Sequence, residues 1–379
     1  MKLIKKNFNF FLIFSSLFII YVPLFKYYID LNNNMGHTFM TADWLINYNH
    51  GYINRGLFGT FLINFFNNQE SMLDFLSLVL IVIYISIFYY ISKIFTQSKQ
   101  NIVSLILIFS PATFLFNIYD SQGSFRKEIL GILALVILAS NIKDKKSYQI
   151  YLGGIIYTIG IFSHSVNLFF LTTLIFILFY KIGSKKFRHY IFFIGSTFLN
   201  ILFYFIFSNS EQDLYRKRNL MCKDLENFGL SNLCGYGSFD FVVWDFNAAY
   251  LITQNITINE NRSASYFYIF LFLLSMIPFL FDKNFYKDFK YYFFIGLSFI
   301  PLFLIGYDWG RWIYIILICF LIVYLTAQKD LINTKIMFIF LVYPVLFRIE
   351  HCCKPMVHFQ DNFIFNNLKY LISNIMSIL

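Results

Sequence analysis

Long runs of apolar residues dominate the chain, and polar residues are confined to short stretches between them. A helix that crosses a bilayer needs about 17–25 mostly apolar residues, and runs such as 168–180 and 266–281 carry no charge. We therefore expect an all-α fold, a polytopic transmembrane helical bundle that forms one integral membrane domain over residues 1–379. The pattern predicts about eleven spans, near residues 8–25, 72–92, 102–118, 128–141, 149–163, 167–181, 190–208, 265–281, 291–306, 312–327 and 335–349.

Two of these predictions leave alternatives open. The basic start of the chain followed by the run 8–25 has the charge order of a signal sequence, but no small-residue cleavage site follows it. It is therefore interpreted as an uncleaved first helix. The runs 149–163 and 167–181 are separated only by Ser163-His164-Ser165. They are two short helices, one long tilted helix or a re-entrant pair.

The distribution of charge sets the expected orientation. With the N-terminus in the cytoplasm, the cytoplasmic segments carry 17 Lys and Arg against four Asp, a sum of +13. The remaining segments carry 13 Lys and Arg against 16 Asp and Glu, a sum of −3. Basic residues collect in short cytoplasmic loops. This predicts a multi-pass membrane protein with its N-terminus in the cytoplasm, a large periplasmic loop at 208–264 and a periplasmic tail at 350–379.

The composition agrees with this class and excludes others. The chain is 58% hydrophobic and only 13% charged, whereas soluble domains have about 25% charged residues. A membrane β-barrel would need alternating polarity in short segments, and five Cys are too few for a disulfide scaffold. The net charge of +10 is explained by the cytoplasmic loops, so no nucleic-acid partner is expected. No glycine-rich phosphate loop occurs, and no cofactor is expected.

The first predicted outer loop carries the first group of candidate residues. Asp43, His50 and Arg55 lie in a stretch rich in Tyr, Asn and Gly. A carboxylate or an imidazole can take a proton from a sugar hydroxyl, and a guanidinium can bind a phosphate with two hydrogen bonds. Asp43 and His50 are therefore catalytic candidates, and Arg55 is a pyrophosphate-binding candidate. The alternative is an amphipathic helix anchored at the membrane surface.

Two further outer segments are short. Arg126 and Lys127 are basic residues on the side that the charge rule depletes of them, which suits a pyrophosphate at headgroup depth. The alternative is a turn whose charges satisfy each other. His164, between two apolar runs, is a catalytic candidate, because a polar residue at membrane depth is a functional hypothesis by default. Its alternative is a histidine that caps a helix end.

The last outer segments lie late in the chain. Asp308 is a catalytic candidate, with Trp309 and Arg311 as substrate-binding candidates; the alternative is an Asp308–Arg311 ion pair between interfacial tryptophans. Arg348 is a further pyrophosphate-binding candidate. The His and Cys residues at 351–358 fit no common zinc spacing, so no metal is expected. In the large loop, Cys222 and Cys234 are a possible disulfide in an oxidising compartment.

This layout resembles the O-antigen polymerases of the Wzy type. The resemblance covers the whole chain as a pattern of spans, one enlarged late periplasmic loop and outer arginines. The segments Asn47–Gly56, Arg126–Glu128, His164 and Asp308–Arg311 also resemble those of GT-C glycosyltransferases, in which an acidic residue of the first outer loop serves the chemistry.

The resemblance implies a multi-pass glycosyltransferase of the bacterial inner (cytoplasmic) membrane that polymerises lipid-linked repeat units during lipopolysaccharide O-antigen biosynthesis. Its substrate would be an oligosaccharide linked to undecaprenyl pyrophosphate, it would work among membrane lipids, and a chain-length regulator and a flippase would be its partners. Three alternatives stay open. They are a GT-C transferase that adds one sugar from a polyprenyl-phosphate donor, a lipid-linked glycan flippase or other transporter, and a membrane acyltransferase.

Overall fold

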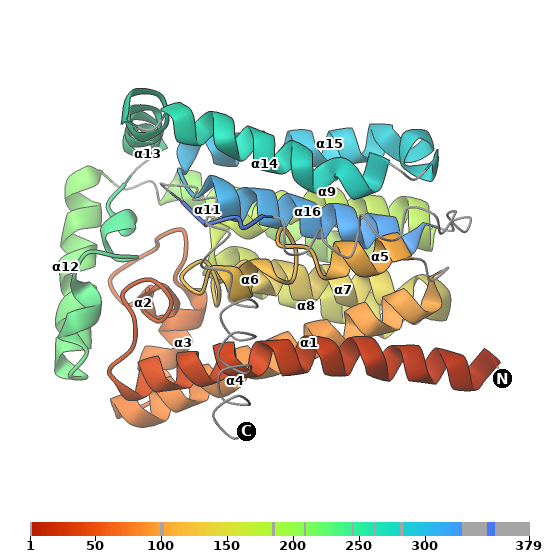
Figure 1. Cartoon of the computed structure of the whole chain (residues 1–379). Helices are drawn as coiled ribbons and strands as arrows, with labels where there is room; N and C mark the ends of the chain where they lie inside the picture. The colour runs from red at the N-terminus through yellow and green to blue at the C-terminus, as the bar shows by residue number, and fades with distance from the viewer. Residues whose placement is uncertain are drawn as a thin grey trace, which may run out of the picture. The chain divides into compact units, whose positions relative to one another are not determined.

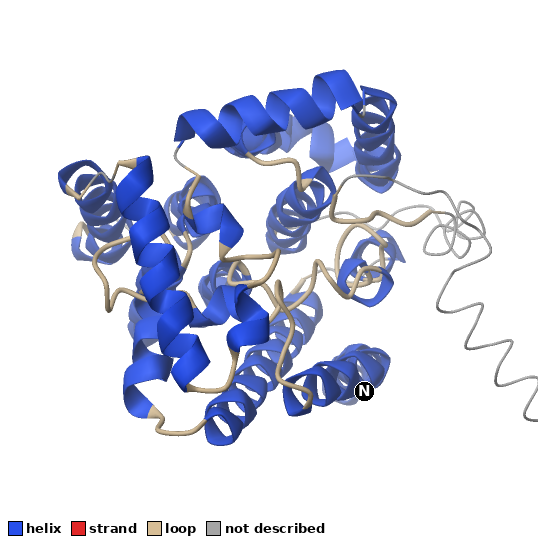
Figure 2. Cartoon of the chain, turned by 90° about the vertical axis from the view of Figure 1, so that its left-hand side faces the viewer, coloured by secondary structure: helices blue, strands red, loops and turns tan. Residues whose placement is uncertain are grey.

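The computed structural model describes residues 2–98, 102–183, 186–207, 210–244, 246–260, 262–280, 283–327 and 347–352. In these residues the secondary structure is entirely helical, and Figure 2 shows helices and loops without a strand. The predicted span 335–349 and the tail 350–379 lie largely outside the described residues. The chain divides into two compact units, Met1–Ser98 with Phe125–Leu251 and Leu325–Gln328, and Lys99–Ser124 with Ile252–Tyr324 and Lys329–Leu379.

The first unit is built on four packed helices. Helix α1 (Lys2–Asn33) packs along α4 (Gln69–Gln97), α4 packs on α7 (Ile129–Asp144), and α7 packs on α8 (Ser147–Ser163) (Figure 1). Every residue of α7 from Ile129 to Asn141 is buried. A helix that is apolar on all sides is stable only when other helices surround it, so α7 forms the centre of this unit.

Shorter elements complete the first unit. Two small helices, α2 (Ala42–Leu45) and α3 (Leu57–Phe65), lie in the predicted first outer loop. After α8 the chain continues through η1 (Ser165–Phe170), α9 (Leu171–Phe176), η2 (Ile177–Ile182), α10 (Arg188–Tyr190), η3 (Ile191–Gly195) and α11 (Ser196–Ile206). The predicted large loop holds α12 (Glu211–Asn227), η4 (Ser231–Cys234), η5 (Asp240–Val242) and α13 (Phe246–Gln254), and α13 begins in the first unit and ends in the second.

The second unit contains the remaining helices. These are α5 (Ile102–Ile108), α6 (Phe116–Tyr119), η6 (Asn255–Glu260), α14 (Arg262–Leu280), α15 (Lys283–Ile305) and α16 (Trp309–Thr326). Helix α14 packs against α15 and α5.

Six helical segments among the described residues are long and apolar enough to cross a membrane. They are Asn7–Asn33, Gln69–Gln97, Ser165–Ile182, Arg188–Ile206, Phe285–Ile305 and Trp309–Thr326. The shorter apolar stretch Ala264–Leu280 matches another predicted span. With 16 residues, α7 extends about 24 Å at 1.5 Å per residue, less than the hydrocarbon thickness of about 30 Å.

Two boundaries differ from the simplest interpretation of the apolar pattern. The run 102–118 does not form one helix, because α5 ends at Ile108 and α6 begins only at Phe116. Pro111 lies in between; it lacks an amide donor and disfavours helical geometry at Ser110. The runs 149–163 and 167–181 form separate elements, since the chain becomes extended at His164 (φ −161°) between α8 and η1.

Candidate functional site

In the polar centre of the first unit, Asp43 lies on a tightly packed backbone segment. Helix α2 is only four residues long, and all four are buried. Trp44 donates an indole hydrogen bond of 2.6 Å to the carbonyl of Phe125. A Cβ atom at Gly59 would lie 2.1 Å from the carbonyl oxygen of Ile46, so the absence of a side chain lets α3 pack directly on the end of α2. These contacts fix the backbone that carries Asp43.

The segment 125–128 is the second part of the site. Phe125 has a left-handed backbone (φ 54°), which costs energy in a residue with a side chain. Its buried ring stacks on Tyr28 at 4.2 Å and meets Tyr84 edge to face at 5.2 Å. This packing compensates for the unfavourable backbone. The chain thereby turns so that Arg126 and Lys127 follow within the unit's interior.

Both basic side chains are held by backbone carbonyls of the first loop. Arg126 donates to Phe39 at 2.9 Å, and Lys127 Nζ donates to Arg55 at 2.7 Å. Lys127 is fully buried and Arg126 is 6% exposed. Two segments about 80 residues apart in sequence are therefore joined around Asp43.

Asp43 is the carboxylate at the centre of this group of basic residues. Its side chain is fully buried, and neither carboxylate oxygen accepts a hydrogen bond from the described residues. Arg55 NH1 lies 3.9 Å from Oδ1. Burial opposes ionisation, but Lys127, Arg126, His164 and Arg55 together hold the pKa of Asp43 below its usual value. The carboxylate is therefore charged and has unused acceptor capacity.

Opposing effects act on the pKa of Lys127. Burial lowers the pKa of Lys127 to about 7, Asp43 opposes that shift, and Arg55 and Arg126 add to it. The neighbouring carboxyl of Glu128, also buried, favours the lysine's charge. A lysine that titrates near neutrality can change protonation state during a reaction.

His164 lies at the break between α8 and η1. Its Nδ1 accepts a hydrogen bond of 3.1 Å from the amide of Val166. This nitrogen therefore caps the start of η1, as the capping alternative predicts. The ring is buried and lies close enough to Asp43 to lower the pKa of that carboxyl. The structure thus brings Asp43, Arg55, Arg126, Lys127 and His164 together.

Asn167 is a supporting residue that the sequence reasoning missed. Its side-chain amide donates to the carbonyls of Gly160 (2.9 Å) and Lys127 (3.3 Å), and its Oδ1 accepts from the amide of Gly131 (3.0 Å). A Cβ at Gly131 would lie 2.5 Å from that oxygen. The available signal was an amide side chain just after His164 at the start of an apolar run. Asn167 joins the His164 turn to the start of α7.

His50 belongs to a different contact. Its Nε2 lies 2.7 Å from Asp224 Oδ2 of α12, and both side chains are about a quarter exposed. Lys217 of the same helix donates to the Tyr52 carbonyl at 3.1 Å. The Cys222–Cys234 disulfide ties α12 to η4. Helix α12 is thus attached to the first loop near His50.

The second unit contains a separate polar cluster around the start of α16. Arg311 pairs with Asp308 at 2.7 Å, and its guanidinium lies 4.6 Å from the ring centre of Trp312. The indoles of Trp309 and Trp312 donate to the carbonyls of Phe303 and Gly306, each at 3.1 Å. This geometry matches the ion-pair alternative for Asp308 and Arg311, and it leaves a substrate role for either residue as a proposal.

Residues 347–352 lie against this cluster. The amide of Gly310 donates to the carbonyl of His351 at 3.1 Å, and a Cβ at Gly310 would lie 1.7 Å from the carbonyl oxygen of Glu350. Only glycine allows this approach. Arg348 pairs with Glu350 at 3.1 Å.

Asp120 and His351 form a pair that sequence reasoning did not connect. Asp120 Oδ2 lies 2.7 Å from His351 Nδ1 and also accepts from the His351 amide, and its Oδ1 accepts from the amide of Gly123 at 3.1 Å. Burial disfavours both charges, but the pairing outweighs it, so the pKa of His351 is raised and that of Asp120 is lowered. Asp120 thereby orients the imidazole and favours its charged form.

A metal centre at this place has only partial support. Ligand atoms of Asp308, His351 and Cys352 lie within 4.8 Å of one another. However, Cys352 is disulfide-bonded, so it has no thiolate to offer a metal ion. The expectation that no metal is used stays a prediction.

The comparisons with known proteins add no relative. No protein-family model matches the chain, and neither the curated proteins nor the solved structures contain a match.

Proposed function

We propose that this protein is a glycosyltransferase of the bacterial inner membrane that polymerises O-antigen repeat units carried on undecaprenyl pyrophosphate. The observation that supports it best is the buried Asp43 carboxylate, which accepts no hydrogen bond from the described residues and has Arg55, Arg126, Lys127 and His164 around it. A charged carboxylate can accept the proton of a hydroxyl, and the cations beside it suit the release of a phosphate.

The proposed reaction forms one glycosidic bond and breaks another. The acceptor hydroxyl of one repeat unit gives its proton to Asp43 as its oxygen attacks the anomeric carbon of the growing chain. The bond from that carbon to the undecaprenyl pyrophosphate breaks, and the electron pair leaves with the pyrophosphate. Arg55, Arg126 and Lys127 stabilise the charge that develops on the leaving group. His164 is a second group for proton transfer in this proposal.

The proposed topology has eleven crossings, a cytoplasmic N-terminus and this site on the periplasmic side. It is supported by the charge sums of +13 for the predicted inner segments and −3 for the others, because basic residues collect in short cytoplasmic loops. A disulfide between Cys222 and Cys234 suits an oxidising compartment such as the periplasm. Trp309 and Arg348 keep their proposed roles in substrate binding, and a flippase and a chain-length regulator are the proposed partners.

One specific observation favours a second candidate. In the GT-C alternative, a single acidic residue of the first outer loop carries the chemistry, and Asp43 is the buried acidic residue of that loop. This protein would then add one sugar from a polyprenyl-phosphate donor. The product distinguishes the two candidates, because a polymerase makes a ladder of chain lengths and a single-sugar transferase does not.

The test is complementation of a deletion strain. We expect deletion to leave lipopolysaccharide with one repeat unit on an intact core. Asp43→Asn should fail to restore the ladder, since general-base catalysis contributes about 10²–10⁴ in rate. Asp30→Asn, which removes an exposed carboxylate of α1, is the matched control and should restore it. An immunoblot measures abundance in the membrane.

The possible results separate the candidates. A normal ladder with Asp43→Asn at normal abundance rules out the proposed base. Loss of the single-unit band on deletion points to a flippase or an earlier transferase. Because the substitution leaves buried cations without their counter-charge, Asp43→Glu is tested beside it. It keeps the charge, and we expect normal abundance with a shortened ladder.

A further inference from the structure

A group of aromatic rings in the first unit lies next to Arg126 and has no part in the proposed reaction. Phe39 is at its centre. The centre of its ring lies 6.0 Å from that of Phe241 and 6.1 Å from that of Tyr236, and the Arg126 guanidinium lies 5.8 Å from it. Arg126 also lowers the pKa of Asp43. The rings therefore adjoin the Asp43 group, and all of these residues belong to the same unit.

Tyr236 is the exposed ring of this group, with 76% of the residue accessible in the described part of the chain. The turn that carries it is nonetheless held on both sides. Cys234 before it is disulfide-bonded to Cys222 of α12, and the amide of Ser238 after it donates to the Thr38 carbonyl at 2.9 Å. A ring on a turn fixed in this way loses little conformational entropy when a ligand stacks on it.

His37 adds a hydrogen-bond donor to the same group. The centre of its ring lies 6.1 Å from that of Phe39. Its Nδ1 accepts hydrogen bonds from the backbone amides of Phe39 and Met40 at 3.2 and 3.3 Å, so this nitrogen carries no proton. Burial and the charge of Arg126 lower the pKa of His37, which favours the neutral imidazole. The proton of the neutral ring is therefore on Nε2, which can donate to an oxygen of a ligand.

An exposed aromatic ring beside a directional N–H donor suits a saccharide. One face of a sugar ring carries C–H groups that pack on an aromatic side chain, and the sugar's oxygens accept hydrogen bonds. Neither Tyr236 nor His37 has its ligand-binding group occupied by an ion pair among the described residues. The Tyr236 ring supplies the apolar surface, and His37 Nε2 supplies the direction.

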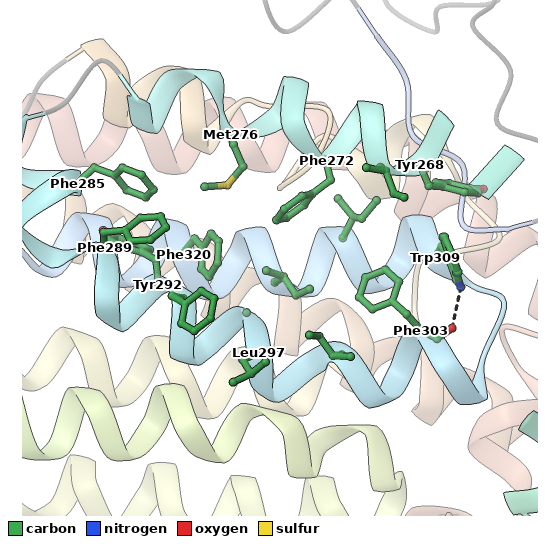
Figure 3. Close-up of a pocket in the computed structure, with 16 residues that line it drawn as sticks. Tyr268, Phe272, Met276, Phe285, Phe289, Tyr292, Leu297, Phe303, Trp309 and Phe320 are labelled. Atoms are coloured by element: carbon green, nitrogen blue, oxygen red, sulfur yellow. Dashed lines mark hydrogen bonds between the residues drawn. The ribbon is translucent and has the colours of Figure 1, made fainter. Parts of the chain in front are cut away.

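An aromatic lining of another kind occurs in the second unit. A cavity of about 370 Å³ is lined there by residues of α14, α15 and α16 (Figure 3). None of the 16 lining residues is charged, and the Trp309 indole at one end already donates to the Phe303 carbonyl at 3.1 Å. This cavity is suited to apolar groups. Tyr236 and His37 differ from it because they lie in loops and combine a ring with a donor.

We propose that Tyr236 and His37 bind a sugar ring next to the one that reacts, and that they thereby select the saccharide. The C–H face of this sugar stacks on Tyr236, and one of its oxygens accepts a hydrogen bond from His37 Nε2. The reacting sugar lies at Asp43, and Phe39 with Arg126 connects the two positions. The saccharide's identity as the acceptor repeat unit rests on the proposed function, whereas saccharide binding itself rests only on these residues.

Exposed tyrosines also occur where proteins meet lipid head groups. The position of Tyr236 favours a saccharide, because it lies between η4 and η5 and not at an end of a candidate span among the described residues. A tyrosine that only contacts lipid would not affect the binding of a soluble saccharide, so the same experiment separates the two roles.

Three variants test the proposal. Tyr236→Ala removes the ring at an exposed position, where little packing is lost. Tyr148→Ala is the matched control, because Tyr148 is 59% exposed at the start of α8 in the same unit. His37→Asn removes the Nε2 donor, and the asparagine oxygen can still accept from the amide two residues ahead. Elution of each solubilised variant in size-exclusion chromatography reports whether it is folded.

The measurement is saturation-transfer NMR on the full-length protein in detergent. The probe is a set of soluble oligosaccharides, released by partial acid hydrolysis from the surface polysaccharide of the source organism, with maltohexaose for comparison. We expect these oligosaccharides to bind and maltohexaose not to bind. Tyr236→Ala and His37→Asn should each weaken binding about tenfold, which corresponds to about 1.4 kcal/mol. Tyr148→Ala should bind normally.

Unchanged binding in both Tyr236→Ala and His37→Asn, or equal binding of maltohexaose, would overturn the inference. The assay needs no catalysis, so Asp43→Asn should bind the oligosaccharides normally. Normal binding combined with an intact ladder in Asp43→Asn would leave the saccharide site standing and remove the proposed base. A lost ladder in Asp43→Asn, with binding that ignores Tyr236 and His37, would do the reverse.

Discussion

Asp43 and Arg55 are close enough to attract each other but too far apart for a hydrogen bond, with 3.9 Å between Oδ1 and NH1. A charge-assisted hydrogen bond between such groups is about 2.7–2.9 Å long. The buried carboxylate therefore keeps its lone pairs while its charge is stabilised by neighbours. In the proposed reaction a substrate hydroxyl therefore donates to this carboxylate without displacing a hydrogen bond from the described residues.

The first prediction concerns the guanidinium of Arg55. Arg55→Ala should shorten the O-antigen ladder strongly, since loss of one donor to a developing oxyanion costs about 10²–10³ in rate. Arg55→Lys should restore it in part, because lysine keeps the charge but loses the planar fork. Arg216→Ala is the control; Arg216 is 69% exposed and pairs with Asp213 on α12. The measurement is a lipopolysaccharide gel beside an immunoblot, and equal ladders for both alanine variants would contradict the role of Arg55.

The second prediction is a pH dependence set by Lys127. Because burial lowers its pKa to about 7, the side chain loses its proton as the pH rises through that value. If the charged form stabilises the leaving pyrophosphate, the transfer rate should fall on the alkaline side with a midpoint near pH 7. Lys127→Arg should flatten this limb, because a guanidinium stays protonated. Initial rates of the purified protein between about pH 6 and about pH 9 measure it.

A control for this experiment is Lys93→Arg. Lys93 pairs with Asp144 at 2.6 Å, away from the Asp43 group. This variant should keep the alkaline limb of the unaltered protein. If Lys127→Arg also keeps it, another group titrates, and the assignment to Lys127 is wrong.

The third prediction separates the two interpretations of Arg311 and Asp308. Removing one partner of a buried ion pair costs about 3–5 kcal/mol, and the Arg311 side chain is 5% exposed. Arg311→Ala and Asp308→Ala should therefore each lower abundance in the membrane. The double variant should regain abundance, because no unpaired charge remains. If the two residues also contact substrate, the double variant should still give a short ladder. A full ladder from the double variant would show that the pair is only structural.

The fourth prediction concerns the Cys222–Cys234 disulfide. A cross-link with a sequence separation of 12 residues stabilises a fold by about 3 kcal/mol. Replacing both cysteines by serine should lower the thermal unfolding midpoint of the solubilised protein. It should also weaken the attachment of α12 to the first loop, because Asp224 of α12 contacts His50 of that loop. Limited proteolysis around α12 measures this directly, and cleavage at an unchanged rate would argue against it.

The fifth prediction concerns topology. Fusions of compartment-specific reporter enzymes at Lys186 and Asn232 should give cytoplasmic and periplasmic signals respectively. The reason is the concentration of basic residues in the predicted inner loops, with sums of +13 inside and −3 outside. Signals from the same compartment at both positions would overturn the topology.

Local features of the sequence were enough for the class of structure. Hydrophobicity adds up over consecutive residues, so a long uncharged run predicts an apolar helix without knowledge of its neighbours. The stretches Gln69–Gln97 and Trp309–Thr326 are examples, and both are continuous helices. The same local reasoning identified polar residues in the connecting loops as chemical candidates.

The partners of those residues depend on contacts between distant segments. Asp43 and Lys127 come together because α1, α4 and α7 pack side by side and Phe125 inserts its ring among Tyr28 and Tyr84. No local pattern encodes such packing. The same reason explains why His50 pairs with Asp224, 174 residues away, instead of joining Asp43.

The sequence by itself therefore determined that this protein is helical and apolar enough to enter a membrane, because that property is a sum over neighbouring residues. Only the tertiary structure decided which candidates share a site. It joined Asp120 to His351, 231 residues apart, and left the Asp43 carboxylate without a hydrogen-bond donor among the described residues. Whether a buried charge is paired depends on the three-dimensional arrangement of its surroundings, which spacing along the chain does not specify.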